Sequence, residues 1–258
     1  MIEKVLKYDG SYNGFLTCVF IAYKQKINVV EIIPEGEDQK QLFSETENVI
    51  TEDLKAKRVL KGLRTKVSSN GLRRLNWAFL SELEGIEIKL FKMIQYIFSE
   101  NIKVDSDYSN PVVLYIENVA KQVGREKHRM EAFVRFRLTK DDIYFAVIEP
   151  DFNVLPIITP HFKNRYADQK WLIYDIKRKF GVYYNLSKTE CVSLELPEDM
   201  GISGGNPEYF ETGEIYFQKL WKEYFEAANI KSRVNMRLHV QHVPKRYWKY
   251  LSEKSPFA

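Results

Sequence analysis

Arginine and histidine side chains interleaved with aromatic residues are the most specific chemical pattern in this sequence. The pattern occupies three stretches of the chain, residues 128–137, 160–178 and 233–248. Arginine and lysine can contact phosphates, and aromatic rings can stack on bases, so the combination is typical of nucleic-acid binding. The candidate DNA-contacting residues are Arg129, Arg135, Arg137, Arg165, Arg178, Arg233, Asn235, Arg237, His239, Gln241, Lys245, Arg246 and Trp248.

The last of these stretches has the clearest pattern, because residues 233–241 alternate between polar and apolar. Strict alternation predicts a strand with one buried face, here formed by Val234, Met236, Leu238 and Val240. The other face carries Arg233, Asn235, Arg237, His239 and Gln241 and has no acid. A purely structural role is the alternative for all three stretches. In that case the aromatic residues fill the core and the arginines lie on a solvated face. We favour it for Phe133 and Trp171 taken alone.

The distribution of charge is more informative than its total. The 39 basic and 35 acidic residues give a net charge of only +4. Bases are concentrated in residues 121–140 (seven bases, two acids), 161–181 (six and two) and 231–254 (seven and one), whereas residues 31–60 and 182–214 are acidic. If the three basic blocks share one face, they form a field suited to a polyanion.

Standard catalytic motifs are absent: the sequence has no phosphate-binding glycine loop with Lys-Ser/Thr, no dinucleotide fingerprint and no nucleophile elbow. The glycine-rich residues 201–205 read as an ordinary surface loop. The catalytic candidates are His128, His161 and Asp175. We expect Asp175 to orient an arginine and not to act as a base.

We expect neither a metal nor a cofactor. The two cysteines, Cys18 and Cys191, are too few for a thiolate zinc site or an iron–sulfur cluster. His239 and His242 are three positions apart in the predicted strand, which would separate their side chains. A carboxylate site remains an alternative, but acids are favoured at turns for structural reasons. Its members would be Asp141, Asp142, Glu149 and Asp151.

The elements that must position these residues begin with a small α/β segment followed by helices. Asn13 is a candidate cap for the first helix. The pattern predicts strands at 5–8 and 27–33, a turn at 9–14, a polar loop over 34–53, and helices over 15–24, 51–63, 71–81, 86–98 and 112–131.

After residue 132 the apolar residues recur at every second position, which is the spacing of a β-strand. Arg135 and Arg137 should share one face of a strand over 133–138, with Val134, Phe136 and Leu138 on the buried face. Thr159-Pro160 should begin a helix through residue 168. The pattern also predicts strands at 143–148, 154–158, 171–176, 181–184, 191–196 and 233–241, with 171–184 as a hairpin, and helices at 214–228 and 244–251.

These elements predict an α+β fold with a small α/β start, a helical middle, an antiparallel β region and a terminal strand and helix. We expect residues 1–258 to form a single domain, with a subdivision near 99–111 as the alternative. A composition of 45% hydrophobic and 29% charged residues is that of a soluble globular protein. The apolar stretch at residues 14–23 is too short to span a bilayer, so we expect no membrane association. The low cysteine content favours a reducing cytoplasm.

Several short motifs together resemble a known bacterial family, the "probable DNA metabolism protein" family, a domain of unknown function. The likeness covers nearly the whole chain. It is carried by Tyr8-Asp9-Gly10-x-x-x-Gly14-Phe15, by His128-Arg129-Met130 with Phe133 and Arg135-Phe136, by Pro160-His161-Phe162-x-x-Arg165-Tyr166, by Trp171-x-Ile173-x-Asp175-x-x-Arg178, and by Gln241-x-x-Pro244-x-Arg246-Tyr247-Trp248.

The resemblance implies which proteins act together with this one, but it implies no catalytic reaction. Members of that family are encoded beside a radical-SAM protein assigned to DNA repair, and they also occur fused ahead of uracil-DNA glycosylase domains. No catalytic residues are established for the family, so none carries over. This sequence lacks the three-cysteine motif of a radical-SAM enzyme, which fits the role of its partner. We find no water-activating signature of a glycosylase and expect no appended glycosylase domain.

Three hypotheses follow. The leading one is a DNA-binding accessory protein that presents damaged or modified DNA to a radical-SAM partner. The alternative is a hydrolase or nuclease in which His161 or His128 is the general acid/base and arginines clamp the phosphate. The third is an interaction scaffold without nucleic-acid contacts. A shallow basic groove would favour binding, and a closed pocket converging on a histidine and a carboxylate would favour catalysis.

Overall fold

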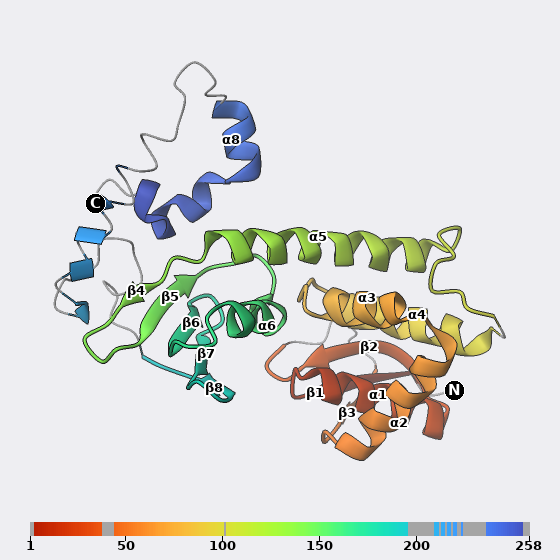
Figure 1. Ribbon diagram of the computed structural model, residues 1–258. Coiled ribbons are helices and arrows are strands. Elements are labelled where there is room, and N and C mark those ends of the chain that lie inside the picture. The colour runs from red at the N-terminus through yellow and green to blue at the C-terminus, as the bar shows by residue number, and fades with distance from the viewer. Residues whose placement is uncertain are drawn as a thin grey trace. The chain divides into compact units, whose positions relative to one another are not determined.

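The chain folds into two compact units, residues 1–124 and 125–258, and the boundary between them falls inside helix α5 (Pro111–Phe133) (Figure 1). The expected α+β fold with a helical middle is confirmed. The computed structural model describes residues 3–37, 44–100, 102–195, 209–211, 213–214, 216–217, 219–220, 223 and 236–254.

The first unit contains a three-stranded parallel sheet in the order β2-β1-β3. Its strands are β1 (Glu3–Tyr8), β2 (Asn28–Pro34) and β3 (Glu45–Asn48), and helix α1 (Tyr12–Gln25) connects β1 to β2. The predictions for β1, α1 and β2 are confirmed. The predicted loop over 34–53 was wrong at β3, because this edge strand has no buried residue and therefore no apolar alternation to reveal it.

The turn between β1 and α1 is tightly packed around one carboxylate. Ser11, and not Asn13 as expected, caps α1: its hydroxyl accepts a hydrogen bond from the Gly14 amide at 2.9 Å. Asp9 accepts hydrogen bonds from the Ser11 and Thr51 hydroxyls at 2.7 and 2.8 Å. A Cβ atom at Gly14 would lie 2.2 Å from Asp9 Oδ1, so only glycine fits there.

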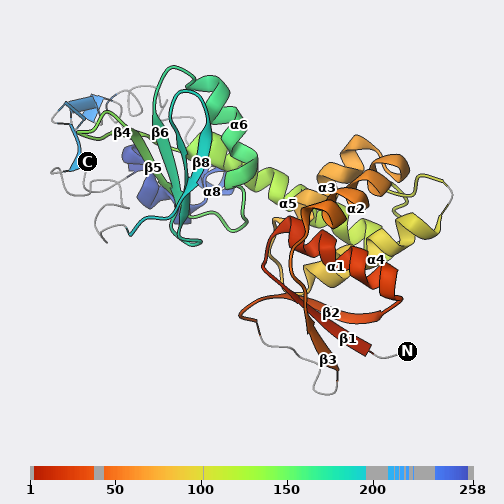
Figure 2. The same cartoon turned by 90° about the horizontal axis from the view of Figure 1, so that it is seen from below.

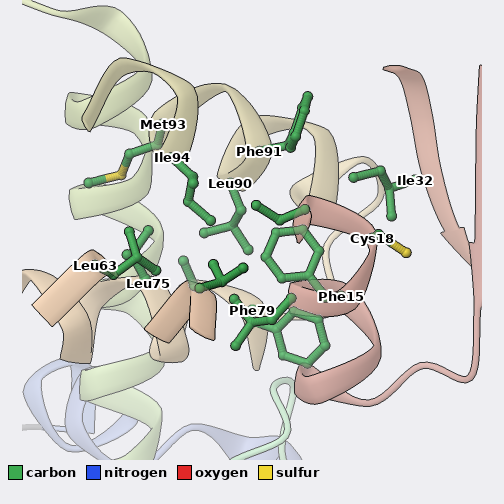
Figure 3. Close-up of a cluster of buried hydrophobic side chains, with 14 of the residues drawn as sticks. Phe15, Cys18, Ile32, Leu63, Leu75, Phe79, Leu90, Phe91, Met93 and Ile94 are labelled. Atoms are coloured by element: carbon green, nitrogen blue, oxygen red, sulfur yellow. The ribbon is translucent and has the colours of Figure 1, made fainter. Parts of the chain in front are cut away.

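Four helices follow, and all four were predicted within a few residues of their observed bounds. They are α2 (Asp53–Lys66), α3 (Ser69–Phe79), α4 (Ile86–Ser99) and α5. Figure 3 shows how apolar side chains of α2, α3 and α4 meet those of α1 and β2 in one core. Phe15, Leu63, Leu75 and Leu90 in this core are completely buried. Burial of such side chains is the main force that holds the unit together.

The second unit contains a five-stranded sheet in the order β4-β5-β6-β7-β8 (Figure 2). The predicted hairpin of β6 and β7 is confirmed, and β5 lies parallel to β6, so the sheet is mixed and not purely antiparallel. A parallel pair needs a crossover, which helix α6 (Leu155–Arg165) provides. The strands are β4 (Arg137–Leu138), β5 (Tyr144–Ile148), β6 (Trp171–Asp175), β7 (Phe180–Tyr184) and β8 (Thr189–Val192).

The structure of residues 154–165 differs from the prediction in two ways. The sequence predicted a strand over 154–158 and a helix beginning at Thr159-Pro160, whereas one helix runs through both. Its buried residues Leu155, Ile158 and Phe162 have helical spacing that continues across Pro160. A short apolar run does not distinguish a strand from the buried face of a helix, and residues 155–158 belong to a helix.

The strand predicted over 133–138 is also corrected. Helix α5 extends through Phe133, and only residues 137–138 form a strand. Arg135 and Arg137 therefore do not share a solvent-facing strand surface. Arg137 is buried with its guanidinium 4.0 Å from the Phe210 ring, and Arg135 is hydrogen-bonded to Glu253.

The predicted strand over 233–241 is wrong where the structure describes it. Residues 236–242 form helix α8 (Met236–His242), and the supposedly buried Met236 and Leu238 are exposed. Methionine, leucine, arginine and glutamine are strong helix formers, so local propensity outweighs the alternation. Arg233, Val234 and Asn235 lie outside the described residues.

Short 3-10 helices form the end of the described chain. The predicted helix over 244–251 is the 3-10 helix η3 (Lys245–Tyr250), which is followed by η4 (Ser252–Lys254). Of the predicted helix over 214–228, the described residues 214, 216–217, 219–220 and 223 are helical. Over the part of the chain that the structure describes, no helix combines the length and apolar character needed to cross a bilayer.

Candidate nucleic-acid interface

A groove of about 930 Å³ lies in the second unit between the end of α5, strands β4 and β5, helix α6 and the C-terminal segment. We call it the aromatic groove. Its aromatic lining residues are Phe136, Tyr144, Phe162, Tyr166, Phe217 and Tyr250, and its charged or titratable ones are Glu131, Arg135, Arg137, His161, Arg165 and Glu214. The volume lies in the range of small-molecule sites.

Three rings form one continuous wall of the aromatic groove. Tyr166 lies nearly parallel to Phe162, with an angle of 9° between the rings and 6.2 Å between their centroids. Phe136 meets both of them edge-on, at 5.4 Å from Tyr166 and 5.6 Å from Phe162. Phe162 is buried, whereas Phe136 and Tyr166 are half-buried. The wall is therefore held by ring–ring contacts, and two of its three residues remain partly exposed.

Arg137 contributes a buried positive charge to the same groove. Only 9% of the residue is exposed. Its guanidinium lies over the Phe210 ring, a cation–π arrangement that fixes its plane. Burial lowers the pKa of Arg137 to about 10, and Glu214 opposes this shift. The side chain therefore stays charged at neutral pH and is held in place before any ligand arrives.

Arg135 lines the groove but has a structural role. Its Nη2 donates to Glu253 at 2.7 Å, and its Nε donates to the other carboxylate oxygen at 3.3 Å. Its Nη1 donates to the carbonyl of Ala132 at 2.7 Å. These contacts tie the end of α5 to η4. Arg135 is thus committed to intramolecular partners.

Arg165 and His161 stand at the exposed edge of the groove on α6. Arg165 is exposed and makes no ion pair with any described residue, and its guanidinium lies 5.7 Å from the Tyr166 ring. His161 is 40% exposed, with its Nδ1 3.9 Å from Glu131 Oε1, too far for a hydrogen bond. Glu131 is paired with Lys127. Arg165 is therefore the cation best placed to meet a phosphate.

A second opening, of about 510 Å³, gathers cations from two of the basic blocks. We call it the charged cleft. It is lined by Glu149, Pro150, Asp151, Lys177, Lys245, Arg246 and Lys249. Two of its cations are neutralised, because Arg246 pairs with Asp151 at 2.5 Å and Lys249 pairs with Glu149 at 2.7 Å. Lys245 is exposed without an ion-pair partner among the described residues.

The buried carboxylate of Glu126 organises one side of this region. It accepts hydrogen bonds from the Tyr247 hydroxyl and, at 2.9 Å, from the Asp151 amide. Arg129 and Arg246 lie 3.4 and 3.5 Å from its other oxygen. Glu126 could not be identified from the sequence, because an acid in a polar helix is typical of a solvent-facing position and its partner Tyr247 is remote in the chain.

Asp175 has the role expected of it. It is completely buried at the end of β6 and accepts hydrogen bonds from the amides of Lys177 and Arg178. Arg178 Nη1 donates to it at 2.9 Å, and the same side chain donates to the carbonyls of Pro150 and Asp151. Burial raises the pKa of Asp175 and the hydrogen bonds from Arg178 oppose the shift. Asp175 orients Arg178.

The catalytic candidates do not converge. His161 lines the aromatic groove, while His128 is exposed on α5 and Asp175 is buried outside that groove's lining. The groove brings together Arg135, Arg137, Arg165 and His161, and the charged cleft brings together Lys245 and Arg246.

The α8 candidates line neither opening. Arg237 and Gln241 are exposed, and His239 is half-buried with its ring 5.9 Å from that of Trp248. Burial lowers the pKa of His239, and the positive charge of Lys254 lowers it further. Because α8 is helical, His239 and His242 share a face, so the argument from strand alternation was wrong. Within the described residues no group of three or more metal-ligating side chains is found.

Comparison with known proteins identifies a family without assigning an activity. No curated protein matches the chain. A family model described as a domain of unknown function, DUF4130, matches residues 84–253, which include every residue that lines the two openings. That match spans more than half of the sequence, so the chain belongs to the DUF4130 family of unknown function.

Proposed function

We propose that this protein binds DNA through the aromatic groove of its second unit and serves as an accessory protein in DNA repair or DNA metabolism. The observation that carries the proposal is the groove itself, in which a fixed aromatic wall lies beside the buried Arg137 and the exposed Arg165. Single-strand-binding proteins combine these two features, aromatic stacking surfaces and cations that follow the backbone.

The cations that remain available set the expected strength of binding. Arg135, Arg178, Arg246 and Lys249 are engaged with carboxylates of the chain itself. Among the described candidates this leaves Arg165, Arg237 and Lys245 as exposed cations without an ion pair, and of these only Arg165 lines the aromatic groove. Few phosphate contacts imply a shallow dependence of affinity on salt, with a slope of about −0.7 per contact for a single strand.

The resemblance to the "probable DNA metabolism protein" family supports the biological context of the proposal. In that context a radical-SAM protein acts as the partner, carries the iron–sulfur cluster and performs the chemistry, while this chain holds the DNA. The chain's two cysteines are too few to hold such a cluster.

The binding proposal is tested by fluorescence anisotropy with labelled single- and double-stranded oligonucleotides over a series of salt concentrations. Arg165→Ala should weaken binding and reduce the salt slope by close to one contact. Lys92→Ala is the matched control, because Lys92 is exposed, lies on α4 of the first unit and makes no ion pair with any described residue. Equal losses in the two variants, or no salt-dependent binding at all, would refute the proposal.

The partner proposal needs a separate measurement. Purified radical-SAM protein encoded beside this chain should co-elute with it, and the pair should bind DNA more tightly than either protein alone. Independent elution at micromolar concentrations, with no gain in affinity, would contradict it.

One observation keeps a hydrolase or nuclease as the second candidate: His161 and the carboxylate of Glu131 line the same groove, 3.9 Å apart. In that hypothesis His161 is the general base and Arg165 clamps the phosphate. Incubating end-labelled DNA with the wild type and with His161→Ala decides between the readings. Cleavage that the variant loses favours the enzyme, and intact DNA favours the binding protein.

A further inference from the structure

We infer that the aromatic groove is a base-binding subsite, which takes one unstacked nucleobase from a single strand against the Phe136–Tyr166 wall. This inference rests on the proposed function, because it names the part of the nucleic acid that the groove recognises. It makes single-stranded DNA, and not duplex DNA, the preferred ligand.

The wall has the geometry that a stacked base requires. Phe162 backs Tyr166 in a nearly parallel arrangement, and Phe136 braces both rings edge-on. Tyr166 therefore cannot rotate freely, and as a half-buried residue it lines the groove. Every base has an aromatic face, so such a surface binds bases with little regard to sequence.

The charges beside the wall fit a nucleotide more closely than an apolar ligand. Arg137 is a buried arginine in the lining, so it places positive charge beside the wall. Arg165, adjacent to Tyr166 in sequence and 5.7 Å from its ring, stands where the phosphate of the same nucleotide would leave the groove. One nucleotide can thus contact the ring and the exposed cation together.

The stacked structure of a DNA duplex blocks this mode of binding. In a duplex both faces of a base are covered by its neighbours, so a base must leave the stack before it can lie on Tyr166. The cost of unstacking falls on the duplex and not on a flexible single strand.

The test compares two oligonucleotides with the same number of phosphates, a twelve-residue oligothymidylate and an abasic chain of equal length. The wild type should bind the oligothymidylate at least about tenfold more tightly, as expected for aromatic stacking. Tyr166→Leu should abolish this preference while keeping the salt slope, and Tyr166→Phe, which retains the ring, should restore it. Tyr115→Leu is the matched control, since Tyr115 is an exposed tyrosine on α5 in the first unit.

The outcomes separate this inference from the proposed function. If neither oligonucleotide binds at low salt, the proposed function fails. If both bind equally with a normal salt slope, DNA binding stands and the base subsite is refuted. Loss of the preference in Tyr115→Leu as well as in Tyr166→Leu would also refute it. Thermal denaturation of each variant shows whether Tyr166→Leu still folds, and the Tyr166→Phe result decides the role of the ring in either case.

Discussion

Arg135 donates two hydrogen bonds to Glu253, a residue 118 positions further along the chain, and so joins the end of α5 to η4. The Glu253 side chain is 4% exposed, so the pair is largely shielded from water. This ion pair holds the last described segment beside the aromatic groove, because Arg135 and Ser252 both line it.

Replacing Glu253 by alanine should destabilise the protein by about 1.5–3 kcal/mol, because the hydrogen bonds involve charged groups and Arg135 would keep its charge without this partner. Urea denaturation followed by circular dichroism measures the change. Glu190→Ala is the control, since its ion pair with Lys188 is exposed and its loss should leave the midpoint unchanged. Equal midpoints for the two variants would show that the Arg135–Glu253 pair contributes nothing.

Tyr247→Phe should cost about 1–3 kcal/mol, because it removes a hydroxyl that donates to the buried carboxylate of Glu126. The ring of Tyr247 keeps its packing against Phe133, so the loss reports the hydrogen bonds of the hydroxyl, which also accepts one from Arg246 at 2.5 Å. The same denaturation experiment checks this, with Tyr115→Phe as the exposed counterpart. A Tyr247→Phe variant as stable as the wild type would mean that Asp151, Arg129 and Arg246 satisfy Glu126 without help.

Gly14→Ala should destabilise the first unit by about 1–3 kcal/mol or more, the usual cost of inserting a methyl group into a closely packed site. The new Cβ would lie 2.2 Å from Asp9 Oδ1 and 2.7 Å from the Thr51 hydroxyl oxygen. At Gly213 the nearest atom to an added Cβ is 3.9 Å away, so Gly213→Ala should be tolerated. Thermal melting distinguishes the two, and a tolerated Gly14→Ala would contradict the tight turn.

Protonation of His239 should oppose folding. Burial and Lys254 both lower its pKa below the ordinary 6.5, so the unfolded chain takes up the proton more readily than the folded one. Stability therefore falls as the pH drops through 6.5 and levels off below the folded pKa. An NMR titration of the imidazole should give a pKa below 6.5, and Lys254→Ala should raise it. A titration at or above 6.5 would disprove the assigned environment.

The elements that could be predicted from the sequence are those with an unambiguous local pattern. Helix α4 has helical apolar spacing, and the β6–β7 hairpin has two β-rich runs close together. The errors fall where a local pattern fits two structures. Residues 154–158 form an apolar run that suits a strand or a buried helical face, and residues 236–241 alternate by chance in a segment of helix formers.

The candidate site could be predicted only in part, for a different reason. The sequence shows where arginines are, but not which of them are already neutralised. Glu253 neutralises Arg135, and Asp151 with Glu126 neutralises Arg246, and these pairings depend on contacts between residues far apart in the chain. Arg165 was named for its neighbours in sequence, and it is exposed and makes no ion pair with any described residue.

The parallel pairing of β5 with β6 has a consequence for how quickly the groove is assembled. Strands β6, β7 and β8 follow one another through short connections, so they can pair as soon as they meet. Strand β5 can join β6 only after α6 has crossed back, which makes the chain close a longer loop before any contact compensates for the lost entropy. Refolding should therefore form the hairpins first, and the aromatic groove should assemble with the slower phase, since β5 and α6 supply part of its lining.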